Sequence, residues 1–342
     1  MKPDKTTTKP LERKNDYVSL KTLKKWVLIA TILFILFLLV LPRLGNQYLS
    51  YLMLSFFGYA IAVLGFNLLF GYGGLLSFGH AFHFAVGAYT VAFLMNKFSI
   101  LSMEIILLIA TGVSAILAAL IGAICVRYTK VYFGMLTLAF NMLFYSFLLK
   151  FYYLTGGDEG MHVLRPILLG FDLSALPKMR FLLGGYYYYA LVVLVIAALV
   201  MWRIISSPFG LSLMAIRDNS EKATNLGINA KRFRWYAFII SGVYTAVGGV
   251  LIAPVVGQVD PTLAYWTHSG TIVFMTLLGG FTIFLGPVLG ALAYIFLQDT
   301  VMSLLYYWRF CFGAMLVFIV IVAPGGIAGV ISSLVKKGKS GE

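Results

Sequence analysis

Long apolar runs separated by short charged segments occupy most of the chain between Trp26 and Val335. A helix needs about 20 residues to cross the hydrocarbon core of a bilayer, and most of the runs reach or exceed that length. The pattern therefore predicts an all-α, polytopic membrane protein. The runs without Asp, Glu, Lys or Arg are 26–42, 44–96, 105–126, 131–149, 181–202, 235–259, 261–298 and 310–335.

Two of these runs are rich in glycine. Segment 71–89 reads GYGGLLSFGHAFHFAVGAY, and segment 278–294 reads LGGFTIFLGPVLGALAY. Such density predicts Gly-broken helices, which a membrane tolerates where protein or water covers the backbone. A broken segment in each half of the chain is also typical of duplicated halves that meet at a central pathway. The alternative is that the glycines serve only close helix packing.

The basic residues indicate which ends of the helices face the cytoplasm. Lys and Arg outnumber Asp and Glu in 1–25, 127–130, 203–234 and 336–342. The positive-inside rule places all four segments in the cytoplasm. In 151–180, by contrast, the two signs of charge are close to balanced, and we expect this loop on the outer side.

Two termini on one side require an even number of crossings. Run 44–96 is long enough for two crossings, so counting every other run, 261–298 included, as one helix gives nine, an odd number. We therefore expect 261–298 to split near Gly279-Gly280 and Gly286-Pro287. The second helix would then run past Asp299 toward Trp308. This gives about ten transmembrane helices. The domain organisation follows as a basic cytoplasmic tail 1–25, a transmembrane domain 26–335 and a cytoplasmic tail 336–342.

Composition agrees with this class and excludes others. Hydrophobic residues make up 61% and charged residues 11% of the chain, whereas soluble domains carry about 25% charged residues. The net charge of +14 lies mostly beside the inner membrane surface, where it faces anionic lipid rather than nucleic acid. The sequence contains no Walker A pattern, so ATP binding through a P-loop is not expected. Cys125 and Cys311 lie in apolar runs, as small buried residues rather than a disulfide.

The polar loop 207–234 has its own helical pattern. Ser207 before Pro208 predicts an N-cap followed by proline in the first turn. Apolar residues at helical spacing then give one apolar face. Asp218 and Asn219 suit the cap of a second short helix, which Gly227 closes in a left-handed conformation. Two short helices at the membrane surface suit a groove on a soluble partner; an ordinary connecting loop is the alternative.

Polar residues inside apolar runs are the other candidates for function. His80 and His83 share a helix face, but a metal site needs a third ligand and no acid lies nearby, so we expect no metal. His80 is better explained as a hydrogen-bonded packing residue at the break. Polar groups at membrane depth need partners or water. The residues predicted to line or adjoin a translocation pathway are Ser77, Gly79, His80, Thr137 and Asn141.

Four collinear segments together resemble a known family. They are GGLLSFGHAFHFAVGAY (73–89), YFGMLTLAF (132–140) with LTGGDEG (154–160), the loop from Ser207, and LLGGFTIFLGPVLGA (277–291). The resemblance is to the permeases of bacterial branched-chain amino acid ABC importers, most of all the M-type permease, and covers roughly residues 50–330. It implies a multi-pass inner-membrane permease subunit that is not itself an enzyme and needs no cofactor.

The same resemblance implies partners and a docking site. The expected partners are a homologous second permease, two cytoplasmic ABC ATPases, an extracytoplasmic solute-binding protein and membrane lipid, without nucleic acid. Segment 207–228 matches the place where such permeases dock the ATPase. There we expect an apolar contact surface with a charged rim. The ATPase-coupling residues expected are Phe209, Gly210, Leu211, Met214, Ala215, Ile216, Arg217, Asp218 and Gly227, with Phe209, Leu211, Met214 and Ala215 forming the apolar surface and Arg217 and Asp218 the rim.

Three alternatives stay open at this point. Relatives in the wider family include urea and amide permeases, so the substrate does not follow from the motifs. An ion-coupled secondary transporter would need ionisable residues deep in the membrane, and Asp299 is the one plausible candidate. A membrane-embedded enzyme built on His80 and His83 lacks a nucleophile–base set or a complete set of metal ligands.

Overall fold

The computed structural model describes residues 31–171, 176–322 and 325–329. The two predicted tails, 1–25 and 336–342, lie outside the described residues. The chain divides at Gln47 into two compact units, residues 1–47 and residues 48–342. The described part of the smaller unit is a helix over 31–40 and a 3₁₀ turn, Leu41–Leu44. The larger unit holds every candidate functional residue.

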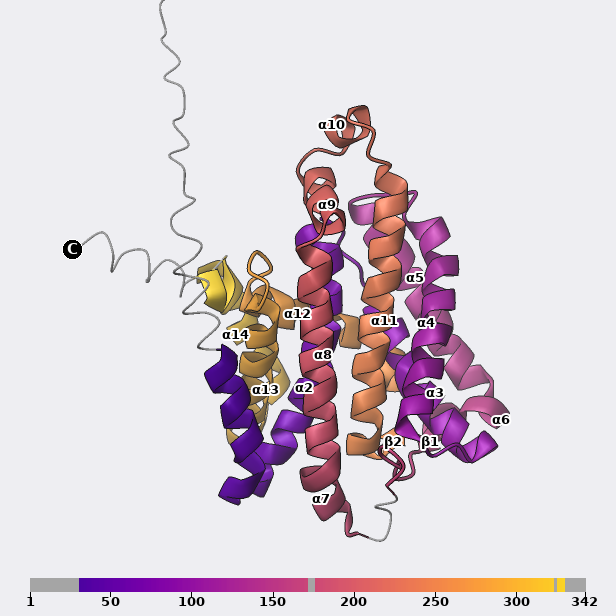
Figure 1. Cartoon of the computed structure of the whole chain (residues 1–342), viewed down its shortest axis with the longest axis vertical. Helices are drawn as coiled ribbons and strands as arrows, with labels where there is room; N and C mark the ends of the chain where they lie inside the picture. Colours follow the sequence, from indigo (N-terminus) through magenta and orange to yellow (C-terminus); the bar gives the residue numbers. More distant parts are fainter. Residues whose placement is uncertain (1–30, 172–175, 323–324, 330–342) are drawn as a thin grey trace, which may run out of the picture. The chain divides into compact units, whose positions relative to one another are not determined.

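The larger unit is almost entirely helical (Figure 1). Its first half contains α2 (Gln47–Asn67) with the π-helical turn η2 (Leu68–Tyr72), α3 (His80–Phe98), α4 (Met103–Cys125), α5 (Val131–Lys150), α6 (Tyr152–Thr155), η3 (Gly157–Glu159) and β1 (Met161–His162). Its second half contains α7 (Lys178–Phe181), η4 (Leu182–Tyr186), α8 (Tyr187–Ile205), α9 (Pro208–Asp218), α10 (Ser220–Asn225), α11 (Ala230–Val256), β2 (Gln258–Val259), η5 (Pro261–Ala264), α12 (Trp266–Gly279), α13 (Gly286–Leu304) and α14 (Trp308–Val322).

Within the described residues, six helical segments are long and apolar enough to cross a membrane. They are Gln47–Tyr72, Met103–Cys125, Val131–Lys150, Lys178–Ile205, Ala230–Val256 and Gly286–Leu304. The predicted all-α polytopic fold is therefore confirmed. The total number of crossings stays a prediction, because α3, α12 and α14 are not among these six.

Contacts between loops show which helix ends lie together. Strand β1, which follows α5, pairs antiparallel with β2, which follows α11. At the opposite end, α9 follows α8 and contacts η2 at the end of α2. Figure 1 shows this separation, with α9 and α10 at the top and the two strands at the bottom. The arrangement agrees with a loop 151–180 on the side of the membrane opposite to 203–234.

The core forms where α11 packs against α3 and α4. Glycines permit the close approach of α3 and α11, because a Cβ added at Gly87 would lie 2.1 Å from the carbonyl oxygen of Ala246. A Cβ at Gly249 would likewise lie 2.0 Å from the carbonyl oxygen of Phe84. Small residues at such contacts are the usual means of packing helices in membranes. Gly87, part of the first glycine-rich run, therefore has a packing role.

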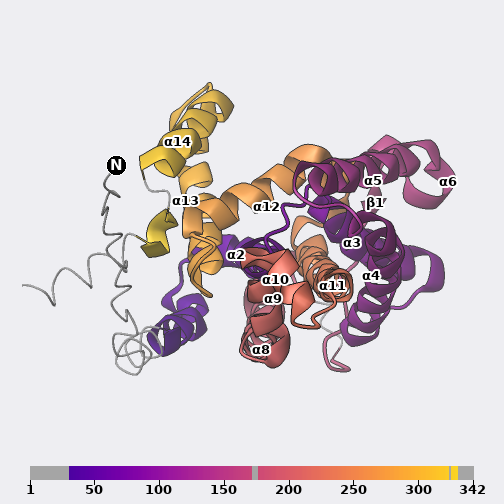
Figure 2. The ribbon, with the colours of Figure 1, turned by 90° about the horizontal axis from the view of Figure 1, so that it is seen from above.

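The second glycine-rich run is split as expected. Helix α12 ends at Gly279, and α13 begins at Gly286. Gly280 has a φ of +95°, which favours glycine. Helix α13 then runs past Asp299 to Leu304. Figure 2 shows α12 between α13 on one side and α3 and α5 on the other, and α12 contacts all three of these helices.

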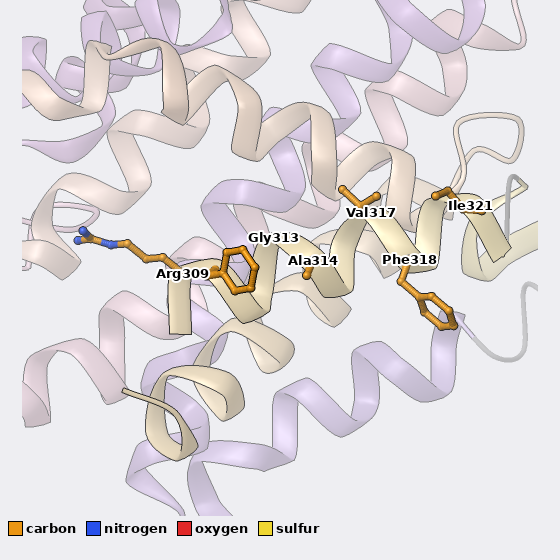
Figure 3. A pocket seen from close by; sticks show the side chains of 7 residues that line it. Arg309, Gly313, Ala314, Val317, Phe318 and Ile321 are labelled. Carbon is orange, nitrogen blue, oxygen red and sulfur yellow. The ribbon is translucent and has the colours of Figure 1, made fainter. Parts of the chain in front are cut away.

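Helix α14 has an open apolar face (Figure 3). Figure 3 labels Arg309, Gly313, Ala314, Val317, Phe318 and Ile321 along this shallow groove. Such a face suits hydrocarbon or another apolar helix. Of the two cysteines, Cys125 is buried and Cys311 is half-buried, and both are free thiols.

Candidate functional site

The polar loop folds into the two short helices that the sequence predicts. Pro208 occupies the first turn of α9, where its missing N–H is not needed. Ser207 stands at the N-cap position in extended conformation, but it makes no capping hydrogen bond. Its Oγ donates instead to the carbonyl oxygen of Ile204 at 2.6 Å, so that detail of the prediction is wrong. Asn219 caps α10 by accepting from the backbone N–H of Lys222 at 2.9 Å.

Helix α9 carries one buried stripe and leaves part of the predicted contact surface exposed. Gly210, Leu213 and Ile216 are buried. Leu211 is 62% exposed, and Ala215 is also exposed. A Cβ at Gly210 would lie 2.1 Å from the carbonyl oxygen of Ile205, so Gly210 lets α9 pack on the end of α8.

The two short helices share a small core with the start of α11. Ile216, Ala223 and Ala230 are buried together, with Ile228 and Phe233 packed against them. Phe209 stacks on Phe233 at a centroid distance of 5.6 Å. We call the set of α9, α10 and the residues joining them to α11 the cytoplasmic body, after the side of the membrane that the basic residues predict for it.

The placement of the coupling residues follows from this core. Leu211 and Ala215 face outward, whereas Phe209 and Met214 are half-buried and Ile216 is internal. Gly227 has a φ of +87°, the left-handed conformation expected of it. Sequence reasoning missed Leu226, which is 83% exposed beside Gly227. A lone leucine in a polar loop was the signal that would have identified it.

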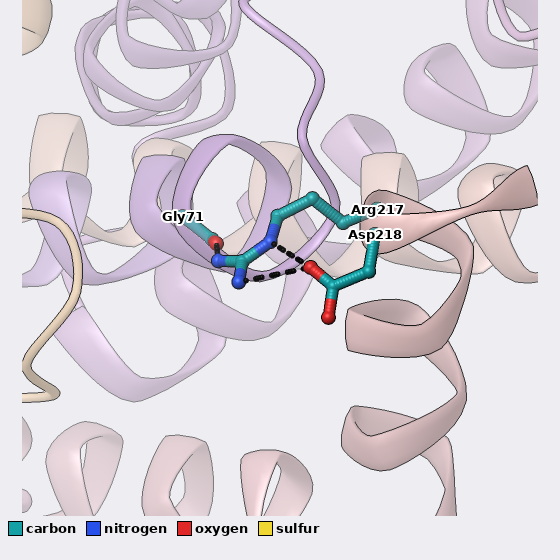
Figure 4. A network of polar contacts seen from close by, with 3 residues as sticks. All are labelled: Gly71, Arg217 and Asp218. Carbon is teal, nitrogen blue, oxygen red and sulfur yellow. Dashed lines mark hydrogen bonds and ion pairs between the residues drawn. The ribbon is translucent and has the colours of Figure 1, made fainter. Parts of the chain in front are cut away.

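Arg217 connects the cytoplasmic body to the first glycine-rich break (Figure 4). Its Nη1 donates a hydrogen bond to the backbone carbonyl of Gly71. Its Nε and Nη2 each lie 3.3 Å from Oδ1 of Asp218. The aliphatic part of the side chain lies over Gly74, where an added Cβ would come within 2.6 Å of the Arg217 Cγ. The guanidinium thus faces the break, with Asp218 on its exposed side.

The break itself is a non-helical stretch of chain between two helices, which we call the extended segment. The helical backbone of η2 ends at Tyr72, and α3 begins at His80. His80 Nε2 lies 2.7 Å from Oγ of Ser241, which is roughly 16 Å along α11 from its first residue by the helical rise per residue. The start of α3 is therefore deep in the helix bundle, whereas Gly74, near the other end of the segment, lies against Arg217 of α9.

Hydroxyl groups satisfy the backbone of this segment. The N–H of Phe78 donates to Thr137 Oγ1 at 3.2 Å, and the N–H of Gly79 donates to Ser77 Oγ at 3.2 Å. The N–H of Ala81, in the first turn of α3, donates to Ser269 Oγ at 2.9 Å. Unpaired backbone groups are costly away from water. Ser77 and Thr137 therefore have a backbone-supporting role in this conformation.

The predicted pathway residues are gathered only in part. Ser77, Gly79 and Thr137 are in contact, and His80 follows directly. Ser77, His80, Thr137 and Asn141 are each 1% exposed or less. The crevice beside them has no room for a water molecule, and its lining is Gly79, Phe82, His83, Ile121, Thr137, Phe140 and Phe238. The structure therefore shows this region closed.

Buried polar groups mark the same region more widely. The side chains of Asn67 and Asn141 make no hydrogen bond to any described residue. The same holds for the Tyr89 hydroxyl and for His268 Nε2. Sequence reasoning named Asn141 but missed Asn67, although a single asparagine in an apolar run is the same signal. Such groups are costly to bury without partners, so they favour a region that takes up water or solute in another conformation.

The two histidines of α3 have separate partners. His80 pairs with Ser241, and His83 Nδ1 lies 3.1 Å from Oγ of Ser114. No group of three His, Cys, Asp or Glu side chains suited to a metal ion occurs within the described ranges. Asp299 accepts a hydrogen bond from the hydroxyl of Tyr48 at an exposed site, rather than facing the break.

Comparison with known proteins places this geometry in context. The family described as the permease component of branched-chain amino acid transport systems matches residues 48–320. The high-affinity branched-chain amino acid transport system permease protein LivM of Escherichia coli (strain K12) is 27% identical over 290 residues, which cover 79% of this chain and 67% of that protein. The LivM protein of Salmonella typhimurium matches to the same extent.

Shorter matches extend to permeases named for other solutes. The nucleoside ABC transporter permease protein NupC of Lactococcus lactis is 37% identical over 57 residues, or 16% of this chain and 18% of that protein. The autoinducer 2 import system permease protein LsrC of Photorhabdus laumondii is 30% identical over 95 residues, or 26% of this chain and 28% of that protein. No solved structure matches the chain significantly. Because the family match spans most of the chain, this multi-pass inner-membrane protein belongs to the family of branched-chain amino acid transport system permease components.

Proposed function

We propose that the chain is the membrane permease subunit of an ATP-driven ABC importer for branched-chain amino acids. The long match to the LivM proteins supports this substrate, since it covers 79% of the chain. The matches to permeases named for a nucleoside and for autoinducer 2 cover 16% and 26% of it. Urea, amides and other small polar solutes are the alternative substrates.

The proposed complex contains a homologous second permease, two cytoplasmic ATPases and an extracytoplasmic solute-binding protein. ATP hydrolysis belongs to the ATPases. The observation that carries this proposal is the cytoplasmic body, which leaves Leu211, Ala215 and Leu226 exposed on the face away from its own core. Exposed apolar anchors within a charged surround are the usual layout of a protein–protein contact.

The proposed route for the solute runs beside the break and α5. Ser77, Gly79, His80, Thr137 and Asn141 remain the proposed lining, and the unsatisfied Asn67 joins them. In the closed conformation, hydroxyls of this set hold the backbone of the extended segment. Opening would exchange some of these contacts for water or for the polar groups of an amino acid.

The docking proposal is tested at Ala215. Ala215→Arg places a long cation on the exposed face of α9 and should release the ATPase or uncouple its hydrolysis, which abolishes uptake. Ala215→Ser keeps the size small and neutral and serves as the matched control, with uptake close to wild type. Both variants should insert normally, because α9 lies outside the membrane. Normal uptake by Ala215→Arg with the ATPase bound would show that α9 is an ordinary connector.

A further inference from the structure

The Gly71 carbonyl stands at the end of a helix. The backbone leaves η2 after Tyr72, and the last carbonyls of a helix have no partner within it. These groups carry the negative end of the helix dipole, which favours a cation. Arg217 supplies that cation through its hydrogen bond to Gly71 (Figure 4). It therefore caps the helix formed by α2 and η2 from a segment far away in the sequence.

The hydrogen bond between Arg217 and Gly71 joins the cytoplasmic body to the segment that leads into α3. On one side, Arg217 extends from α9, which packs through Ile216 into the core of the cytoplasmic body. On the other side, Gly71 is joined through the extended segment to the start of α3. That start is held to α5 by Thr137, to α11 by Ser241 and to α12 by Ser269. A continuous series of contacts thus links α9 to three helices.

The Arg217 side chain fits against Gly74 only because glycine has no Cβ. The φ of Gly74 is +68°, and an added Cβ would lie 2.6 Å from Cγ and 3.4 Å from Cβ of Arg217. The arginine stem therefore rests directly on the break. Asp218 lies on the exposed side of the guanidinium, with its side chain 72% exposed against 36% for Arg217.

We propose that Arg217 is a positioning residue that ties the cytoplasmic body to the break after α2, so that movement of α9 opens and closes the region around Ser77. This rests on the proposed function, because the movement comes from the docked ATPase. Arg217 then acts toward the transmembrane helices, through its contact with Gly71 and Gly74, and not as part of the polar rim around the docking surface.

The test compares substitutions on both sides of the contact in the assembled transporter. Arg217→Gln removes the cation, and Gly74→Ala displaces the arginine while leaving its charge. Both should keep the ATPase bound and hydrolysing, yet import per ATP should fall about tenfold, the size expected for loss of one charged hydrogen bond. Arg217→Lys keeps the positive charge and can still donate a hydrogen bond, so its import per ATP should lie between that of Arg217→Gln and wild type.

The control for Gly74→Ala is Gly170→Ala. Gly170 has a similar positive φ of +81°, but nothing lies within 4 Å of an added Cβ. It therefore imposes similar backbone strain without touching Arg217, and its coupling should equal wild type. An equal loss in Gly170→Ala would attribute the effect to strain and overturn the proposal.

A second readout follows the break directly. In Ser77→Cys, the introduced thiol should react with a water-soluble thiol reagent at a rate that changes when nucleotide is added. In Arg217→Gln, that nucleotide dependence should disappear while the ATPase stays bound. An unchanged nucleotide dependence, or loss of the ATPase from Arg217→Gln, would overturn the proposal. Loss of insertion in both Arg217 variants would do so too, by showing a folding role. The Ala215→Arg variant separately reports whether docking on α9 holds.

Discussion

Thr137 offers a direct test of how the break is held in place. In Thr137→Val the side chain keeps its shape, but the N–H of Phe78 loses the hydroxyl that it donates to at 3.2 Å. This hydrogen bond is part-buried, so its loss falls toward the lower end of the about 1–3 kcal/mol that an orphaned buried donor costs. At about 2.1 cal/mol/K per residue, a chain of 342 residues has an unfolding entropy of about 0.7 kcal/mol/K, so the unfolding midpoint should fall by roughly 1–4 °C.

The assay is thermal unfolding of the detergent-solubilised complex, followed by loss of the folded fraction. Thr137→Ser retains the hydroxyl and should stay near wild type. Thr276→Val is the matched control for removing a buried hydroxyl, because Thr276 Oγ1 donates to the helical carbonyl of Ile272 at 3.0 Å and its loss orphans no N–H group. If Thr137→Val unfolds at the wild-type temperature, or no lower than Thr276→Val, the hydroxyl does not support the break.

Two further predictions concern packing and topology. Gly87→Ala should force α3 and α11 apart by about 1 Å, because its Cβ would lie 2.1 Å from the Ala246 carbonyl oxygen, and overpacking of this kind costs about 1–3 kcal/mol. The control, Gly112→Ala, has nothing within 4 Å of the added Cβ and should express normally. Equal yields of folded protein from the two variants would refute the argument. Reporter fusions after Lys339 and near Asp158 should report the cytoplasm and the outer side respectively, and an outward C-terminus would contradict the even number of crossings.

Local patterns in the sequence predict several elements well. The Gly/Pro cluster at 279–287 predicts a break because glycine and proline destabilise helix interiors wherever they occur. The cap-like Asn219 and the glycine at 227 predict the ends of the short helices for the same local reason. The basic residues predict the orientation, which stays a prediction, because the contacts between β1 and β2 and between α9 and η2 show only which helix ends lie together.

Other features depend on contacts that no local pattern reveals. Helix α9 carries two apolar stripes, and its neighbour Phe233 and the Ala223–Ala230 core decide which one turns inward. The partner of Arg217 lies 146 residues away in sequence. Thr137 was recognisable as a polar residue in an apolar run, but its use as a backbone acceptor requires the position of Phe78. These contacts join residues far apart in the sequence, so they follow from the fold and not from any local pattern.

The central claim is that this permease moves its solute with energy from ATP hydrolysed by a partner docked on α9. The most direct measurement is uptake of labelled leucine into proteoliposomes that hold the complete complex, with ATP supplied to the ATPase side and ionophores present to remove ion gradients. We predict uptake that requires ATP hydrolysis, persists with the ionophores and is lost in Ala215→Arg. Uptake that proceeds without ATP and collapses with the ionophores would contradict the account.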